Sequence, residues 1–209
     1  MLLMANATEI KLSLINWLLN KYQEDIILGN EVAYSPIIRR ADLVMLHNNH
    51  SYAFEIKSDC DTTKRLNEQL NDYMKAFDFV FVVTTKLLFK EIKLSIPKNV
   101  GIIVVENKVI QKRKAIQIKR LNKRFLAEFL DRKILLQQLK KDKKSFSVYD
   151  LRDDICKQLT TKQLRILAIE SISSKYIYQS KLLKYDVIHS GITIEDVKTL
   201  TGGHLSHIH

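Results

Sequence analysis

The sequence is poor in the residues that mark several large classes of protein. It holds only five glycines among 209 residues, and none forms a Walker loop or a GxGxxG turn, which argues against nucleotide-driven motors and dinucleotide-dependent redox enzymes. Its two cysteines, Cys60 and Cys156, are far apart and show no CxxC spacing. We therefore expect neither a disulfide framework nor a zinc site, and a reducing cytoplasm as the compartment.

Long hydrophobic runs are also missing. The apolar stretches, such as residues 79–83 and 101–105, are far shorter than the roughly 20 residues that a membrane span needs. The N-terminus has no basic region before its few apolar residues, so no signal peptide is expected. With 46% hydrophobic and 27% charged residues, the chain is expected to be soluble and globular, either one medium domain or a core with a small appendage.

Acidic residues are scarce in one window. Residues 108–144 contain 14 lysines and arginines but only 3 aspartates and glutamates, a net charge of +11 that equals the net charge of the whole chain. Such a block predicts a polyphosphate partner, because lysine and arginine neutralise phosphates and release counterions. The alternative is a solubilising helix face.

What the sequence does contain is a hairpin-like stretch at residues 40–57. If Asn48 and Asn49 form a two-residue turn, Asp42 on the first strand faces Glu55 on the second. Directly opposed residues have Cβ atoms roughly 4.5–5.5 Å apart, so the two carboxylates could hold one divalent cation. Without a cation they would repel each other, and this cost favours a metal site. The alternative is a turn one residue longer, which slips the register and leaves both carboxylates as exposed charges at a sheet edge.

The order of predicted elements indicates an α/β core followed by helices. The expected elements are helix 8–20, strand 31–34, hairpin 40–57, helix 64–77, strand 78–85, helix 86–96, strand 102–105, basic strand 109–118, and helices 121–141, 148–159, 161–172, 180–189 and 193–200. Thr8 and either Thr160 or Thr161 are expected to cap helices, and 140–147 is the best linker candidate. We expect a core over residues 1–118 and a basic, mostly helical region over residues 119–209.

Four segments in the first half of the chain together resemble a known family. They are Arg39-Arg40-Ala41-Asp42, Phe54-Glu55-Ile56-Lys57-Ser58, the Gln69 and Tyr73 pair at a Gln-x-x-x-Tyr spacing, and the run 77–83. Their order over residues 8–85 is similar to that of the PD-(D/E)xK nuclease superfamily, especially its small bacterial and phage-borne members. Ala41 stands where the family has its nominal proline. The resemblance implies a restriction-endonuclease-like core, which is a mixed central sheet flanked by helices.

The resemblance also implies a role for each motif residue. Asp42, Glu55 and Lys57 would be the catalytic residues. The ligands of Mg²⁺, or of Mn²⁺ in its place, would be Glu31, Asp42, Glu55 and the backbone carbonyl of Ile56. Lys57 would orient the attacking water and offset the charge that develops on the phosphorus.

Residues around this motif receive less direct roles. The scissile phosphate would be held by Lys64, Arg65 and Gln69, and Arg40 would be a further phosphate contact. The alternatives are passive, exposed side chains and, for Arg40, a structural salt bridge. Tyr73 is expected to pack in the core, because it lies in the apolar stripe of its helix.

Some acidic and histidine residues compete for these roles. Glu9 is the runner-up for the metal position given to Glu31. His47 and His50 flank the turn at the far end of the hairpin from Asp42, so we expect them on the surface. A flexible tail is expected for His204, His207 and His209, although three histidines could also catch a transition metal.

Taken together, these features predict a metal-dependent nuclease that hydrolyses phosphodiester bonds, with DNA as the expected substrate and the basic segment 108–144 gripping its backbone. Cutting both strands of a duplex with one such site would need two copies, so a homodimer is one expected arrangement. One alternative is a catalytically idle nucleic-acid-binding module that serves a repair or phage complex. Another is a protein-interaction role for the C-terminal helices, with the basic segment contacting an acidic protein.

Overall fold

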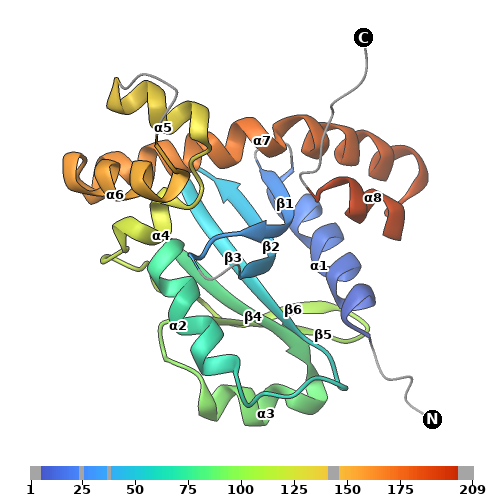
Figure 1. The fold of residues 1–209 in the computed structure, drawn as a ribbon. Coiled ribbons are helices and arrows are strands. Elements are labelled where there is room, and N and C mark those ends of the chain that lie inside the picture. The colour runs from blue at the N-terminus through green and yellow to red at the C-terminus, as the bar shows by residue number, and fades with distance from the viewer. Residues whose placement is uncertain (1–5, 24–25, 37–38, 141–145, 202–209) are drawn as a thin grey trace.

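A computed structural model describes residues 6–23, 26–36, 39–140 and 146–201 of the chain. One six-stranded mixed sheet forms its centre, with the strands in the order β1-β2-β3-β4-β5-β6 (Figure 1). β3 is parallel to β4 and β4 is parallel to β5, whereas the other neighbours are antiparallel. The strands are β1 Ile27–Ala33, β2 Arg40–His47, β3 His50–Lys57, β4 Phe79–Thr85, β5 Gly101–Val105 and β6 Val109–Arg113.

Helices flank this sheet and form nearly all of the regular structure after β6 (Figure 1). They are α1 Ala7–Tyr22, α2 Leu66–Ala76, α3 Lys86–Ser95, α4 Lys123–Ala127, α5 Arg132–Leu139, α6 Val148–Gln158, α7 Thr161–Ser190 and α8 Ile194–Thr199. The expected α/β architecture, a mixed sheet flanked by helices with a helical C-terminal region, is confirmed at this level.

Each face of the sheet buries its own hydrophobic cluster, because successive residues along a strand point to opposite faces. Helix α1 covers one face, where Ile10 is fully buried. Helices α2 and α3 cover the other face with Leu70 and Ile92. Helix α7 contributes to both clusters, through Tyr176 on the α2 face and Leu183 on the α1 face. It therefore passes from one face to the other along the edge strand β1 (Figure 1).

Helix α7 and the residues after it also satisfy the backbone of that edge strand. The Ser180 hydroxyl accepts a hydrogen bond from the Leu28 N–H at 2.8 Å and donates one to the Leu28 carbonyl at 3.0 Å. The Asn30 N–H donates to the Leu200 carbonyl at 3.0 Å. An uncovered edge strand is a template for pairing with another chain, so these contacts protect β1. The C-terminal region thus completes the core of the first region, and the boundary between residues 118 and 119 stays a prediction.

Several boundaries of the first elements and of β6 differ from those predicted. Asn6, not Thr8, caps α1: its side chain accepts from the Glu9 N–H at 2.9 Å, and the Glu9 carboxylate accepts from the Asn6 N–H at 3.1 Å. Strand β1 begins at Ile27 rather than at residue 31. Strand β6 ends at Arg113, because the chain then leaves the β5 ladder.

The helices after β6 also divide differently. The single helix expected over residues 121–141 is two helices, because Asp131 caps α5 by accepting from the Ile134 N–H at 2.8 Å. The two helices expected over 161–172 and 180–189 are one 30-residue helix, α7, since no glycine or proline interrupts residues 173–179. Thr160 is confirmed as its cap.

Parts of several predictions lie outside the described residues. They are residues 141–145 of the linker candidate, which include the last residues of the basic segment and of the helix expected over 121–141, and the tail histidines His204, His207 and His209. Among the helices that the structure does describe, none combines the length and the apolar character needed to cross a membrane.

Candidate active site

The β2–β3 hairpin has the predicted turn and register. Asn48 and Asn49 both have positive φ, 48° and 57°, which is the backbone of the two-residue turn that asparagine favours. The ladder runs from the His47–His50 pair to the Leu43–Phe54 pair. Beyond its last pair, the next residues on the two strands are Asp42 and Glu55, so the hairpin brings together the two carboxylates expected from the sequence.

At this point side-chain contacts replace the backbone ladder. The Asp42 Oδ2 atom accepts a hydrogen bond from the Ile56 N–H at 2.7 Å. The Tyr73 hydroxyl donates to Glu55 Oε2 at 2.7 Å and lies 3.3 Å from the Asp42 N–H, which donates to it. Glu55 is only 2% exposed. Tyr73 is buried in the core as predicted, but its hydroxyl is also part of the site, which the sequence analysis missed.

Lys57 completes a charged cluster on the same face of β3 as Glu55. Its Nζ lies 2.8 Å from Glu55 Oε1 and donates to Gln69 Oε1 at 3.1 Å. Gln69 comes from α2, so this contact fixes the ammonium group between strand and helix. The structure therefore brings Asp42, Glu55, Lys57 and Gln69 together. Gln69 was expected to hold a phosphate, and here its amide oxygen holds Lys57.

A further polar group lies beside Lys57. Thr84 on β4 is the register partner of Lys57 and is fully buried. Within the described part of the chain, its Oγ1 atom has no hydrogen-bond partner. A buried hydroxyl is rarely left unpaired, so this site has hydrogen-bonding capacity that the protein itself does not use. The sequence offered no pattern that marks Thr84.

The surroundings of the cluster raise the pKa of Asp42. Burial and, next, the charge of Glu55 raise this pKa to about 7, because the Ile56 N–H and Lys11 offset only part of these effects. Burial likewise raises the pKa of the Tyr73 phenol well above its ordinary value, and the nearby charge of Glu55 adds to this. Tyr73 thus stays a neutral donor to the carboxylate.

We expect the unfolding free energy of the chelator-treated protein to fall as the pH rises from about 4 to about 7. In this window the folded state keeps a proton on Asp42 that the unfolded chain has already released, because the folded pKa is the higher one. Urea unfolding across the window measures the slope. The Asp42→Asn variant should lose much of it, whereas the variant of an exposed acid on α7, Glu170→Gln, should keep it. Equal slopes in wild type and Asp42→Asn would contradict this account.

Glu31 lies next to the cluster but is turned toward α1. The β1–β2 register places it between the Asn30–Leu43 and Val32–Ala41 pairs, and so opposite Asp42. Its φ is 51°, and its carboxylate lies 3.0 Å from Lys11 Nζ on α1. Among the described residues, no three Asp, Glu, His or Cys side chains are gathered as a metal site. The donors that lie together are therefore the carboxylates of Asp42 and Glu55.

The other predicted residues lie around the rim. Arg40 is exposed, and its Nη1 donates to the Glu31 carbonyl at 3.2 Å, a structural contact. Lys64 and Arg65 are exposed just before α2. The Glu9 carboxylate is used in the cap of α1. Ile56 lies in β3 between Glu55 and Lys57, and its N–H is bonded to Asp42.

The described part of the basic segment, residues 108–140, contains cations that form structural hydrogen bonds and cations that are exposed. Some of its cations are structural: Arg113 donates to the Val100 and Pro97 carbonyls at 2.7 and 2.9 Å, and Lys123 donates to the Cys156 carbonyl at 2.9 Å. Others are exposed, namely Lys108, Lys112, Lys114, Lys119, Arg120, Lys133 and Lys140. The exposed ones are available to an anionic partner.

Comparison with known proteins gives one family and two individual similarities. The sequence model of the family described as Bacteriophage P4 protein cII matches residues 4–201. Protein cII of Enterobacteria phage P4 is 31% identical over 179 residues, which cover 80% of this chain and 67% of that protein. A solved structure of a protein of unknown function from Silicibacter pomeroyi has a TM-score of 0.46 and 15% identity over 66% of this chain and 90% of its own.

Proposed function

We propose that this chain, which belongs to the Bacteriophage P4 protein cII family, is a metal-dependent nuclease that hydrolyses phosphodiester bonds in DNA. The observation that carries the proposal is the cluster of Asp42, Glu55 and Lys57 at the point where the β2–β3 ladder ends. Glu55 and Lys57 are buried in it, and Asp42 is half-buried. A restriction-endonuclease-like core is part of the same proposal. It is supported by the hairpin register and by the Gln69 and Tyr73 contacts from the following helix.

The cluster is hard to explain as a purely structural feature. Taking two carboxylates and an ammonium group out of water costs free energy, and a buried ion pair seldom returns more than a well-packed apolar pair would. The raised pKa of Asp42, caused by burial and by the charge of Glu55, shows that this cost is present here. Groups with strongly perturbed pKa values gather at functional sites, because catalysis needs such values.

The residues fit a divalent cation such as Mg²⁺ or Mn²⁺. Asp42 and Glu55 offer the hard oxygen ligands that Mg²⁺ prefers, and the Ile56 carbonyl is a further candidate. A cation would offset the repulsion between the two carboxylates, while the unpaired hydroxyl of Thr84 could bind a water molecule at the site. When bound, the ion would supply an activated water and Lewis-acid polarisation of the phosphate.

Side chains of the protein would supply the other contacts to the substrate and hold the site in place. Lys57 is fixed by Glu55 and Gln69, so its ammonium group can donate hydrogen bonds to a phosphate oxygen as negative charge develops there. Tyr73 holds Glu55 in place through its hydroxyl. Arg40, Lys64 and Arg65 are exposed at the rim and would contact neighbouring phosphates, and a homodimer would place one site on each strand of a duplex.

Binding of Mg²⁺ tests this proposal without depending on turnover. We expect Mg²⁺ at about 100 times its dissociation constant to stabilise the wild-type protein by about 2.7 kcal/mol at a pH near 8, because a ligand of the folded state shifts the unfolding equilibrium. Thermal unfolding with and without Mg²⁺ measures the effect. Asp42→Asn should not respond, and Glu170→Gln should respond like wild type. If Mg²⁺ and Mn²⁺ leave the wild-type melting temperature unchanged, the metal site does not exist.

One contact favours a second candidate function, an idle nucleic-acid-binding module. The Lys57 ammonium lies 2.8 Å from Glu55 and neutralises it without any metal ion. Such a protein would bind DNA equally well in chelator and with Mg²⁺, and would cut with neither. Metal-dependent stabilisation that is lost in Asp42→Asn would count against it.

A further inference from the structure

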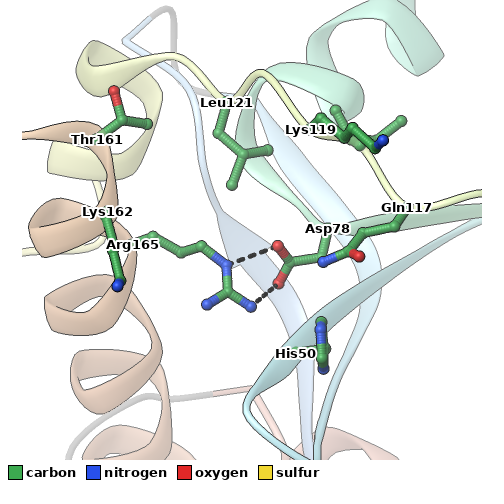
Figure 2. Close-up of a pocket in the computed structure, with 9 residues that line it drawn as sticks. His50, Asp78, Gln117, Lys119, Leu121, Thr161, Lys162 and Arg165 are labelled. Atoms are coloured by element: carbon green, nitrogen blue, oxygen red, sulfur yellow. Dashed lines mark hydrogen bonds and ion pairs between the residues drawn. The ribbon is translucent and has the colours of Figure 1, made fainter.

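A second polar site lies at the opposite end of the hairpin from the carboxylates. It is a pocket of about 490 Å³ at the start of α7 (Figure 2). Its walls come from the start of β3, from Asp78 before β4, from the segment after β6 and from the first two turns of α7, and they include His50, Lys119, Lys162 and Arg165. His50 and Glu55 are five residues apart on β3, a separation of roughly 17 Å at about 3.3 Å per residue. The pocket is therefore distinct from the proposed active site.

The acidic group in the pocket is already neutralised. Arg165 Nε lies 2.7 Å from Asp78 Oδ1, and its Nη2 lies 2.8 Å from Asp78 Oδ2, the pair drawn with dashed lines in Figure 2. The Ser51 N–H also donates to Asp78 Oδ2 at 2.8 Å. Asp78 is 1% exposed, so it offers little charge to a ligand.

Two lysines in the pocket wall take no part in the ion pair of Asp78 and Arg165. Lys162 comes from the first turn of α7 and Lys119 from the segment after β6, and Figure 2 shows the Arg165–Asp78 pair between these two walls. Both lysines are exposed, and neither forms an ion pair with another described residue. With Asp78 paired to Arg165, the pocket carries an excess of two positive charges, which favours an anion.

The rest of the lining indicates what kind of anion. The pocket is larger than a bare phosphate group needs, and its volume lies within the range of small-molecule sites. Ile118 and Leu121 supply apolar surface, and Gln117 and Thr161 supply hydrogen-bonding groups. A ligand with a phosphate for the lysines and a partly apolar base with hydrogen-bonding groups for the remaining surface matches this combination.

We propose that this pocket binds a nucleotide unit, with Lys119 and Lys162 holding its phosphate. The nucleotide is either a free mononucleotide or one residue of a nucleic-acid strand. The strand source rests on the proposed function, whereas the free nucleotide does not. In the strand case, the pocket is a second grip on DNA, remote from the cluster of Asp42, Glu55 and Lys57.

The test measures binding in chelator, so that no cleavage can occur. The probes are thymidine 5′-monophosphate, thymidine and a short fluorescein-labelled oligothymidylate, measured by calorimetry or fluorescence anisotropy. The pocket variant is Lys119→Ala/Lys162→Ala. The matched control is Lys90→Ala/Lys98→Ala, which removes two exposed lysines in and just after α3, outside the basic segment, and therefore the same charge. All four side chains are exposed, so folding should be retained, and thermal unfolding checks this.

We expect the pocket variant to bind at least about tenfold more weakly, because each lost charge-assisted hydrogen bond removes a substantial part of the affinity. The control should change binding by less than about twofold. For the oligonucleotide, the slope of log affinity against log salt should fall by about 0.7 in the pocket variant, because the two lysines together hold one phosphate of the strand. Thymidine should bind more weakly than its monophosphate, since it lacks the phosphate.

The probes separate the two sources. Loss of monophosphate binding identifies a free-nucleotide site, and loss confined to the oligonucleotide identifies a strand contact. The proposal is overturned if the control variant weakens binding as much as the pocket variant, or if neither variant changes it. It is also overturned if no probe binds the folded protein. None of these results depends on whether the protein cuts DNA.

Discussion

Replacing Asp42 with asparagine is expected to slow DNA cleavage on the order of 1000-fold and, at the same time, to stabilise the fold. The first effect follows because the variant loses one of the two carboxylates that would hold the metal ion. The second follows because the pKa of Asp42 is raised to about 7 by burial and by Glu55. A neutral isostere removes this charge from its half-buried position, which should stabilise the fold by on the order of a few kcal/mol at a pH near 8.

The opposite signs of the two effects make Asp42→Asn a sharp test. Replacing a residue that serves stability would lower both activity and stability. Replacing a residue that serves function at a cost in stability lowers activity and raises stability. Cleavage rate and urea unfolding, measured on the same preparation, give both numbers. Glu170→Gln is the control for the loss of one acidic charge. A variant that cuts as fast as wild type would contradict the assignment of Asp42 to the active site.

The other two members of the cluster extend this test. Lys57→Met should lower the cleavage rate by about 100- to 1000-fold, because it removes a positive charge placed where negative charge develops. Glu55→Gln should do at least as much, while its amide oxygen can still accept from Tyr73. Residues that act as one unit are non-additive, so the double variant should be little slower than the slower single variant. Lys90→Met, an exposed lysine on α3, is the control.

Replacing Asp78 with alanine is expected to destabilise the protein by about 3–5 kcal/mol, the usual effect of breaking a buried ion pair. Asp78 accepts hydrogen bonds from Ser51 and from Arg165, and Arg165 Nη2 also donates to the Asn49 carbonyl at 2.6 Å in the hairpin turn. The variant leaves Arg165 with an uncompensated charge. It also removes one of the contacts between the start of α7 and the sheet, while the hydrogen bond from Arg165 to the Asn49 carbonyl can remain.

Chemical denaturation of three variants tests this network. Asp78→Ala/Arg165→Met should be more stable than Asp78→Ala alone, because the second change removes the orphaned cation. Lys162→Ala, in the same turn of α7 but outside the ion pair, should change the free energy of unfolding by less than about 0.5 kcal/mol. A loss below about 1 kcal/mol in Asp78→Ala would show that the pair contributes little.

The sequence predicted those parts of the site that depend on local pattern. The hairpin register followed from the Asn48-Asn49 turn and the strand periodicity, and it brought Asp42 to Glu55. The four-residue spacing from Gln69 marked Tyr73 as a neighbour on the same helix face. That spacing could not reveal that the Tyr73 hydroxyl reaches Glu55, because the contact depends on how α2 sits on the sheet.

Contacts between residues far apart in the chain could not be predicted from local sequence patterns. Asp78 and Arg165 are far apart in the chain, and nothing near either residue marks the other as its partner. The hydrogen bond between Ser180 on α7 and Leu28 on the edge strand β1 also joins residues far apart in the chain, so local pattern could not predict it. The continuity of α7 was missed for another reason: residues 173–179 are polar on average and have no apolar stripe, yet they pack beside β1.

The most direct measurement of the central claim is cleavage by the purified wild-type protein. Labelled single-stranded, duplex and branched DNA and RNA are each incubated with Mg²⁺, with Mn²⁺ and with chelator, and the products are separated by size. We expect DNA to be cut with either metal ion and to stay intact in chelator. A folded protein that leaves all four substrates intact with both metal ions would contradict it.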